Sequence, residues 1–147
     1  MATTIWPVRA ADSEGIKKEL AQLQGEWSML SGSADGQPMP DGMRKQMKRL
    51  CKGDETTTTM GEQMFLKAKI TIDPSKNPKT IDYDMMDGFT KGKKQLGIYE
   101  VDAETFKSCF AKPGEGRPAD FTSKPGDGRT LSVWKRKKEA APASEKK

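Results

Sequence analysis

Short runs of alternating apolar and polar residues, separated by turns rich in glycine, proline, asparagine and aspartate, recur along most of this chain. The clearest run is MFLKAKITI at 64–72, where every second residue from Met64 onward is apolar and would share one face of a strand. Further strands are expected at 26–31, 56–59, 80–85, 95–101, 105–110, 119–123 and 130–136. The segment 43–50 stays open between helix and strand, because Met43, Met47 and Leu50 also have helical spacing.

One short amphipathic helix is predicted before these strands, at 12–23, where Ile16, Leu20 and Leu23 recur at helical spacing. About eight short strands without alternating helices indicate a mainly β protein, either an antiparallel barrel or a sandwich. A closed barrel is favoured, because closure removes strand edges and leaves an interior that side chains or one small ligand can fill. We expect a single barrel domain at 12–136, between a flexible segment at 1–11 and a disordered Lys/Glu/Ala tail at 137–147.

The composition is polar, with 33% hydrophobic and 32% charged residues. No stretch approaches the roughly 18 apolar residues of a membrane span, and the start of the chain lacks the apolar core of a signal peptide. The chain as written is therefore expected to be soluble and cytoplasmic, whereas a periplasmic or secreted location stays open if a leader was removed. The formal charge of +5 lies toward the C-terminal end, where 112–147 holds ten basic and five acidic residues.

No histidine occurs in the sequence, which excludes Ser-His-Asp and Cys-His catalysis and zinc sites built on imidazole. The acidic run DYDMMDG at 82–88 superficially resembles a calcium loop, but its spacing is wrong and Lys93 and Lys94 stand where the closing acidic ligand would be needed. Alternation instead places Asp82 and Asp84 on the polar face of a strand. We expect no metal site, no cofactor and no enzymatic activity.

The two cysteines, Cys51 and Cys109, are too few for a disulfide framework and form no Cys-x-x-Cys pair. Buried free thiols are the favoured interpretation, and a single long-range bridge is the alternative.

Two nearly identical hexapeptides, KPGEGR at 112–117 and KPGDGR at 124–129, could form a duplicated anion site or two tight turns. Proline followed by glycine predicts a type II turn, and neither copy precedes a helix whose N-terminal amides would complete a phosphate site. Two turns are the favoured interpretation. Arg117, which leads into Pro118, is expected to fix the barrel rim or a ligand, whereas the second copy is expected to be an ordinary hairpin connection.

Trp27 opens the first expected strand and Arg136 ends the last. Because the first and last strands of a closed barrel are neighbours, the guanidinium can lie over the indole and gain a cation–π attraction of about 0.5 to 2 kcal/mol. This predicted clamp would cover one end of the barrel; the alternative is a core tryptophan and a surface arginine without contact.

Several spaced motifs between Leu23 and Arg136 resemble a known family. They are LQGEW, the DGQPMP turn, LCKGDE, ITIDPSKNPKTIDY, KGKKQLGIYEVD, CFAKPGEGRPADF and the closing LSVWKR. GEW with a basic residue at the end of the last strand is similar to the signature of lipocalins and their calycin relatives. The larger set resembles an uncharacterised lipocalin-like domain abundant in planctomycete bacteria, which implies a barrel and permits a ligand but supplies no reaction.

The function expected from these observations is a noncatalytic, lipocalin-like binding or interaction module, with a small hydrophobic molecule as its possible ligand. Candidate ligand-binding residues are Arg117, Tyr99 and Phe121. The nine methionines agree with an adaptable site, although methionine is also ordinary core filler. The alternative is a basic surface that binds nucleic acid or an acidic protein through Lys45, Lys48, Arg49, Lys52, Lys135, Lys137 and Lys138.

Overall fold

Antiparallel pairing between neighbouring strands, and a final pairing between the last strand and the first, define this structure. The computed structural model describes residues 5–88 and 91–137, with the backbone alone at 5–13. The elements in this part of the chain are α1 (Ile5–Leu23), β1 (Gly25–Ala34), β2 (Gln37–Pro38), α2 (Asp41–Arg44), β3 (Met47–Lys52), β4 (Glu55–Met60), β5 (Gln63–Asp73), β6 (Lys79–Gly88), β7 (Lys94–Val101), β8 (Thr105–Phe110) and β9 (Thr130–Arg136).

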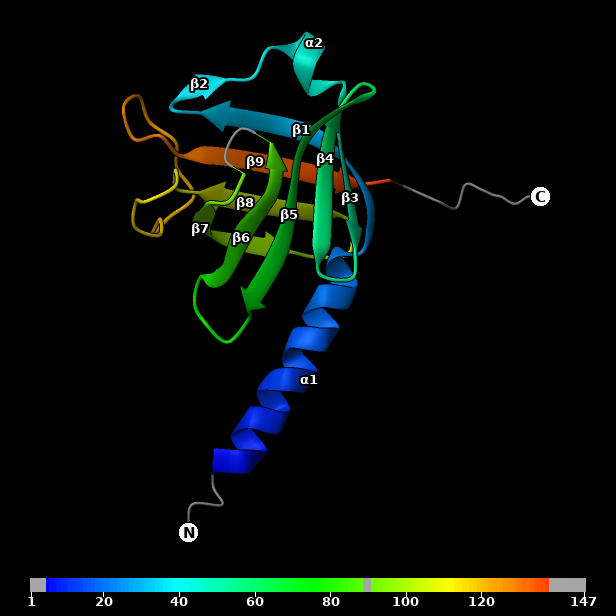
Figure 1. Cartoon of the computed structure of the whole chain (residues 1–147), viewed down its shortest axis with the longest axis vertical. Helices are drawn as coiled ribbons and strands as arrows, with labels where there is room; N and C mark the ends of the chain where they lie inside the picture. The colour runs from blue at the N-terminus through cyan, green and yellow to red at the C-terminus, as the bar shows by residue number, and fades with distance from the viewer. Residues whose placement is uncertain (1–4, 89–90, 138–147) are drawn as a thin grey trace, which may run out of the picture.

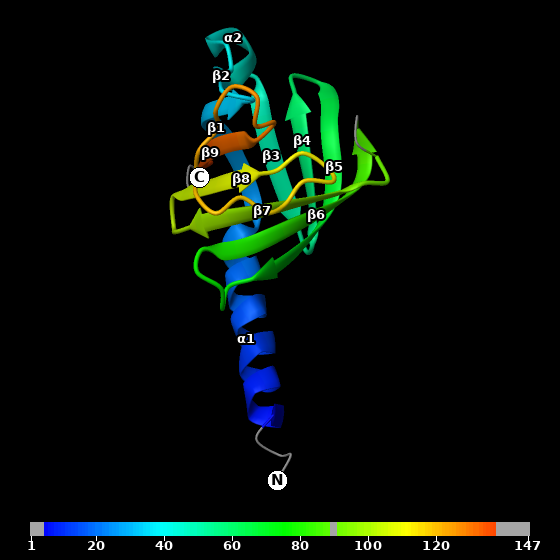
Figure 2. The same ribbon diagram turned by 90° about the vertical axis from the view of Figure 1, so that its left-hand side faces the viewer.

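Eight of these strands close into an antiparallel barrel with a helix before them, as the sequence predicts (Figures 1 and 2). From β3 onward each strand pairs with the next, and β1 pairs with both β3 and β9. β2 adds only two residues alongside the end of β1. The β1–β9 register pairs Trp27 with Arg136 and Met29 with Trp134, so the first and last strands meet as a closed barrel requires.

The N-terminal helix is longer than expected. α1 begins at Ile5 rather than at residue 12, so residues 5–11 of the segment predicted to be flexible are helical. Pro7 lies in the first turn, where its missing backbone N–H costs no helical hydrogen bond, and Ala10 and Ala11 are good helix formers. Residues 1–4 and 138–147, including most of the predicted tail, lie outside the described residues.

The segment 43–50 contains both structures that its spacing allowed. The helical turn α2 ends at Arg44, and β3 begins at Met47. Within β3, Met47, Arg49 and Cys51 are buried and the residues between them are exposed, which is the period of a half-buried strand.

The strand predicted at 119–123 does not form. These residues belong to the β8–β9 loop (111–129), where Thr122 Oγ1 donates to Asp120 at 2.7 Å and Ser123 Oγ accepts from the Gly36 N–H at 2.8 Å. The segment thus makes side-chain hydrogen bonds instead of a strand ladder. The face predicted for 64–72 also differs at one end: a bulge in β5 opposite Thr58 and Thr59 shifts the register, and Met64 is 48% exposed.

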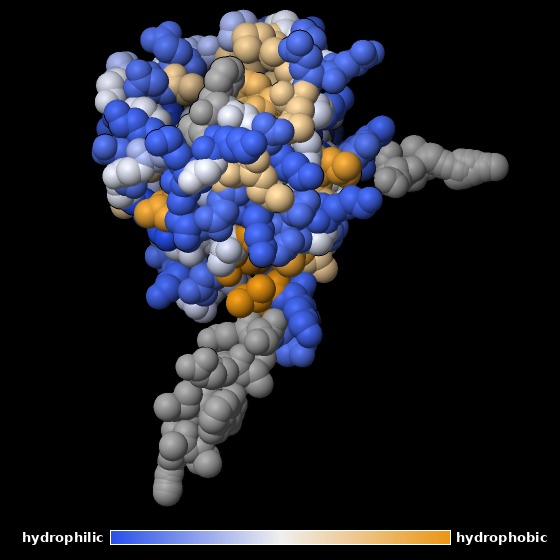
Figure 3. All heavy atoms as spheres, in the orientation of Figure 1, coloured by the Kyte–Doolittle hydropathy of each residue, from blue (hydrophilic) through white to orange (hydrophobic). Residues whose placement is uncertain are grey.

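The two ends of the barrel differ, because α1 covers only one of them. Successive turns of an antiparallel sheet alternate between the two ends. The β3–β4, β5–β6 and β7–β8 turns lie at the end where α1 enters (Figure 1). Here Leu23, Trp27 and Phe106 are fully buried, with Ile16 and Leu20 of α1 packed against the core. Figure 3 shows hydrophobic residues gathered where α1 meets an otherwise largely hydrophilic face.

Arg136 joins β9, α1 and the β7–β8 turn at this closed end. Its Cζ lies 4.2 Å from the centroid of the Trp27 ring, so the contact expected between these two residues is present. The guanidinium also donates to the carbonyls of Ala103 (2.9 Å), Gln24 (2.7 Å) and Gln22. Trp27 Nε1 donates to the Leu23 carbonyl at 3.0 Å, which ties the ring to the end of α1.

Arg136→Met keeps the aliphatic stem but removes the charged donor from three carbonyls and the cation–π contact. We expect the free energy of unfolding to fall by about 1 to 3 kcal/mol. Lys135→Met, at the exposed neighbouring position of β9, is the matched control and should change stability by less than about 0.5 kcal/mol. Urea denaturation of both variants decides this; equal stabilities would show that Arg136 does not hold the closed end.

Candidate functional site

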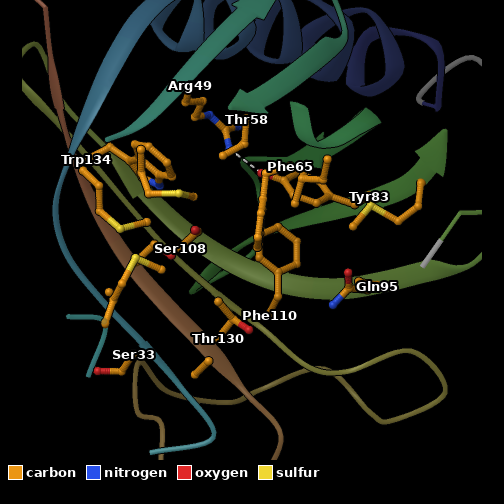
Figure 4. Close-up of a pocket in the computed structure, with 18 residues that line it drawn as sticks. Ser33, Arg49, Thr58, Phe65, Tyr83, Gln95, Ser108, Phe110, Thr130 and Trp134 are labelled. Carbon is orange, nitrogen blue, oxygen red and sulfur yellow. Dashed lines mark hydrogen bonds between the residues drawn. The ribbon is translucent and has the colours of Figure 1, made fainter. Parts of the chain in front are cut away.

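A cavity of about 250 Å³ lies inside the barrel, toward the end away from α1. The exposed residues Ala34 and Thr130 are part of its lining, so the cavity reaches the surface. Figure 4 shows the lining side chains. They are Met29, Gly32, Ser33, Ala34, Met39, Met47, Arg49, Thr58, Phe65, Leu66, Tyr83, Met85, Gln95, Ser108, Phe110, Thr130, Ser132 and Trp134.

The strand period explains this lining. Inward positions alternate along each strand, so β3 contributes Met47 and Arg49, and β8 contributes Ser108 and Phe110. The Phe110 ring packs 4.1 Å from the Tyr83 ring, centroid to centroid. Gly97 permits this close packing, since a Cβ at that position would lie 2.6 Å from the Phe110 ring. Most of the cavity wall is therefore apolar or aromatic.

Arg49 is the exception in this wall. Its side chain is 2% exposed and reaches inward from β3, where Nη1 donates to the Tyr83 hydroxyl (Figure 4). The guanidinium carbon lies 4.5 Å from the centroid of the Phe106 ring and 5.7 Å from that of Tyr83. Nε and Nη2 are buried and have no hydrogen-bond partner among the described residues.

The sequence-based placement of Arg49 on a basic outer surface is therefore wrong. The segment 43–50 is basic, and the helical spacing of Met43, Met47 and Leu50 left its type open. That spacing hid the strand period of two that starts at Met47. That period, with Met47 and Cys51 flanking Arg49 on one face, is the signal that could have located the arginine inside.

The other residues of the basic set lie on the outside of the barrel. Lys45, Lys48, Lys52, Lys135 and Lys137 are exposed. Lys48 Nζ donates to Ser28 Oγ at 3.1 Å, and Lys137 pairs with Glu26 at 3.1 Å. Lys138 lies outside the described residues. Without Arg49, and with Glu26 among the lysines, this face is less positive than the sequence suggested.

Tyr99 lies at the closed end of the barrel, and the cavity lining described above does not include it. It is fully buried, and its hydroxyl donates to Glu19 Oε2 of α1 at 3.1 Å. The same carboxylate oxygen accepts from Lys79 Nζ at 2.6 Å. Burial, together with the negative charge of Glu19, raises the pKa of Tyr99 above its usual value. This candidate ligand residue thus anchors α1 to β7, and Lys79 anchors the same carboxylate to β6.

Arg117 and Phe121 lie on the outer side of the barrel, in the β8–β9 loop. Arg117 Nη1 contacts Asp82 Oδ1 at 2.6 Å and donates to the Gly97 carbonyl at 2.8 Å. Phe121 covers Lys107, whose Nζ is 4.5 Å from the ring centroid. The three candidates for ligand binding are therefore not brought together, and none belongs to the lining residues that the structure describes.

Both hexapeptides form tight turns. The N–H of Glu115 donates to the Lys112 carbonyl and that of Asp127 to the Lys124 carbonyl, each at 3.1 Å. The glycine after each proline has φ near +90°, the left-handed conformation that a type II turn requires. The second copy also contacts the β1–β2 turn, because the Gly128 N–H donates to Asp35 at 2.8 Å.

Both cysteines are free and buried, as the favoured interpretation predicts. Cys51 faces the interior near α1, where Gln24 Nε2 lies 3.7 Å from its sulfur. Cys109 faces outward and is covered by the β8–β9 loop, with Sγ 3.4 Å from the Thr122 carbonyl oxygen. Burial raises the pKa of both thiols, so neither is poised as a nucleophile.

The three aspartates of the acidic run at 82–88 each contact a different group. Asp82 binds Arg117, and Asp84 lies 3.9 Å from Lys94. The Asp87 side chain accepts from the Gly88 N–H at 2.9 Å.

Across the described ranges, no helix is long and apolar enough to cross a membrane.

A second hollow, of about 350 Å³, lies outside the barrel between α1 and the β5–β6 turn. It contains the Lys79–Glu19 ion pair, whose charges already satisfy each other. The interior cavity is the stronger candidate, because it is lined mainly by apolar side chains around one charged group.

The fold and this cavity define a closed β-barrel with an apolar interior that reaches the surface at one end. Comparison of the chain with protein-family models, curated protein sequences and solved structures gave no significant match.

Tyr99 should make the stability of the barrel depend on pH above about 10, the usual pKa of tyrosine. Because the folded state raises its pKa, the stabilisation by the neutral phenol is present below that pH and is lost as the pH rises further. We expect the free energy of unfolding to fall there by up to about 1.4 kcal/mol per pH unit more in the wild type than in Tyr99→Phe. Urea denaturation from pH 8 to 11 measures this, and parallel curves would contradict it.

The Arg117–Asp82 pair should couple the β8–β9 loop to β6. A double-mutant cycle with Arg117→Met and Asp82→Asn should give a coupling energy of about 1 kcal/mol, because both side chains are partly shielded. The Lys94–Asp84 pair is the control: it is 3.9 Å apart and more than half exposed, so its coupling should be near zero. A coupling no larger than that of the control would rule out this attachment.

Proposed function

We propose that this protein is a noncatalytic binding module of the lipocalin-like type, which holds one small hydrophobic ligand inside its barrel. The observation that carries the proposal is the interior cavity of about 250 Å³, walled mainly by apolar side chains and continuous with the surface at one end. Its volume lies just below the range of about 300 to 1,000 Å³ that is usual for small-molecule sites. An apolar protein cavity of about 150 Å³ is already large enough for benzene.

The asymmetry of the barrel supports this function. α1, Trp27 and Arg136 seal one end with buried side chains and hydrogen bonds. The other end carries Ala34 and Thr130 on the rim of the cavity. A ligand would therefore enter at the end away from α1.

The chemistry of the wall supports binding rather than catalysis. Four of the lining residues are methionines, whose flexible thioethers adapt to the shape of a ligand: Met29, Met39, Met47 and Met85. The polar lining residues other than Arg49 are hydroxyl or amide side chains, and the described lining includes no carboxylate, thiol or histidine that could act as a general base.

We expect the neutral hydrophobic dye N-phenyl-1-naphthylamine to bind with increased fluorescence, and native mass spectrometry to show one ligand per chain. Ser132→Leu adds methyl groups inside the cavity and should weaken dye binding at least tenfold. Ser28→Leu, on the outer side of β1, is the control and should leave it unchanged.

Equal dye affinity in these two variants would place the dye on the outer surface and contradict the proposal. An oligonucleotide titration at low salt addresses the alternative function. Tight binding that weakens steeply with salt, together with absent dye binding, would favour the basic surface instead.

A further inference from the structure

We infer that the ligand is a small carboxylate with an apolar tail, and that Arg49 receives the carboxylate inside the barrel. This inference rests on the proposed function, since it names the chemical class of the ligand for the same cavity. The site is built from a charged side chain that is 2% exposed, has two unpartnered nitrogens and belongs to the cavity lining.

The first argument is charge. Arg49 is the only charged residue among the eighteen lining residues that the structure describes. A guanidinium stays ionised at any ordinary pH, so Arg49 cannot avoid the cost of burial by losing its proton. A buried charge is tolerated when a partner compensates it, and the wall offers no anion. An anionic ligand supplies the missing partner.

The second argument is the geometry of the unpartnered atoms. Nη1 is already used by the Tyr83 hydroxyl, whereas Nε and Nη2 are not used by the described residues. These two nitrogens form one edge of the planar guanidinium, and two parallel N–H bonds from such an edge match the two oxygens of a carboxylate. The free edge therefore selects a planar, bidentate acceptor.

The surroundings of Arg49 do not replace that acceptor. The Phe106 ring, 4.5 Å from Cζ, stabilises the cation through its π face but offers no oxygen or nitrogen acceptor to Nε or Nη2. Tyr83 accepts the Nη1 bond and keeps its own hydroxyl proton, which it can donate to a ligand oxygen. Arg49 and Tyr83 thus form a pair of donors at one place in the wall.

The position of Arg49 orients the ligand. Met39 and Thr130 lie toward the rim, whereas Arg49 of β3 is the register partner of Trp27 of β1, whose ring belongs to the closed end. The carboxylate enters first and the tail extends toward the rim along the methionines. Nε and Nη2 are enclosed in this structure, so a side chain beside them shifts when the ligand enters. Met29 and Met47 line the same cavity and are flexible enough to do so.

The cavity volume sets the size of the tail. A volume of 250 Å³ equals about eight water molecules at about 30 Å³ each. An eight-carbon carboxylate is a suitable probe, with the terminal methyl group near the rim.

The test is isothermal titration calorimetry of the full chain with octanoate, 1-octanol and acetate. Octanoate should bind wild type at least tenfold more tightly than 1-octanol, which has the same tail without the charge, and acetate should bind at least a hundredfold more weakly. Arg49→Met should lose at least tenfold in octanoate affinity and keep its 1-octanol affinity. Lys48→Met is the matched control, since it removes the same charge from the neighbouring outward position of β3 and should bind like wild type.

Stability gives a second readout that a purely structural arginine would not show. Arg49→Met removes a buried charge that lacks full compensation, so its urea midpoint without ligand should equal or exceed that of wild type. At the same concentration, octanoate should raise the urea midpoint of wild type more than that of the variant. If Arg49→Met does not fold, Tyr83→Phe provides the same comparison, because it removes one of the two donors and should weaken octanoate binding but not 1-octanol binding.

The outcomes separate the two proposals. Equal affinities for octanoate and 1-octanol, unaffected by Arg49→Met, would overturn the carboxylate site and leave the hydrophobic-ligand function standing. Absence of binding by octanoate, 1-octanol and the neutral dye would overturn both. Octanoate binding that Lys48→Met weakens as much as Arg49→Met does would place the anion on the outer surface and overturn the site.

Discussion

The pairing of β1 with β9 is the constraint on which the rest of the structure depends. It converts a row of short strands into a closed wall, and it brings Trp27 and Arg136 together although they lie far apart in the sequence. Arg136 then links β9 to the carbonyls of Gln22 and Gln24 at the end of α1. Closure of the sheet and sealing of one end therefore share the residues of β1 and β9.

Inside the barrel, the sealed half and the open half have different chemistry. The sealed half is packed with aromatic and aliphatic side chains, and the buried Glu19 carboxylate there is shared by Tyr99 and Lys79. The open half contains the cavity, and among the arginines whose side chains the structure describes only Arg49 is buried; it is only partly compensated. A buried charge without a full set of partners lowers stability, so its presence is better explained by binding than by packing. The same residue thus connects the energetics of the fold with the proposed ligand.

Much of the fold could be predicted from the sequence, but little of the candidate site could. Strand period, turn residues and the positions of Trp27 and Arg136 are local signals, and they predicted the barrel and its closure. The β8–β9 loop was misread at 119–123, because its polar groups are satisfied by Asp120, Arg129 and the distant Gly36 rather than by a strand. Arg117, chosen for its place before Pro118, and the candidates Tyr99 and Phe121 each have a partner elsewhere in the fold: Asp82, Glu19 and Lys107.

The sequence by itself determined that this chain is a mainly β protein with one helix before its strands, since alternation, turn residues and helical spacing are properties of neighbouring residues. It also excluded histidine chemistry. The tertiary structure decided which side of β3 faces the interior, because the basic segment 43–50 fits helical spacing as well as a strand, and a shift of one residue exchanges the two faces of a strand. For that reason Arg49, one residue from the exposed Lys48, became the only charged group among the described residues of the cavity wall.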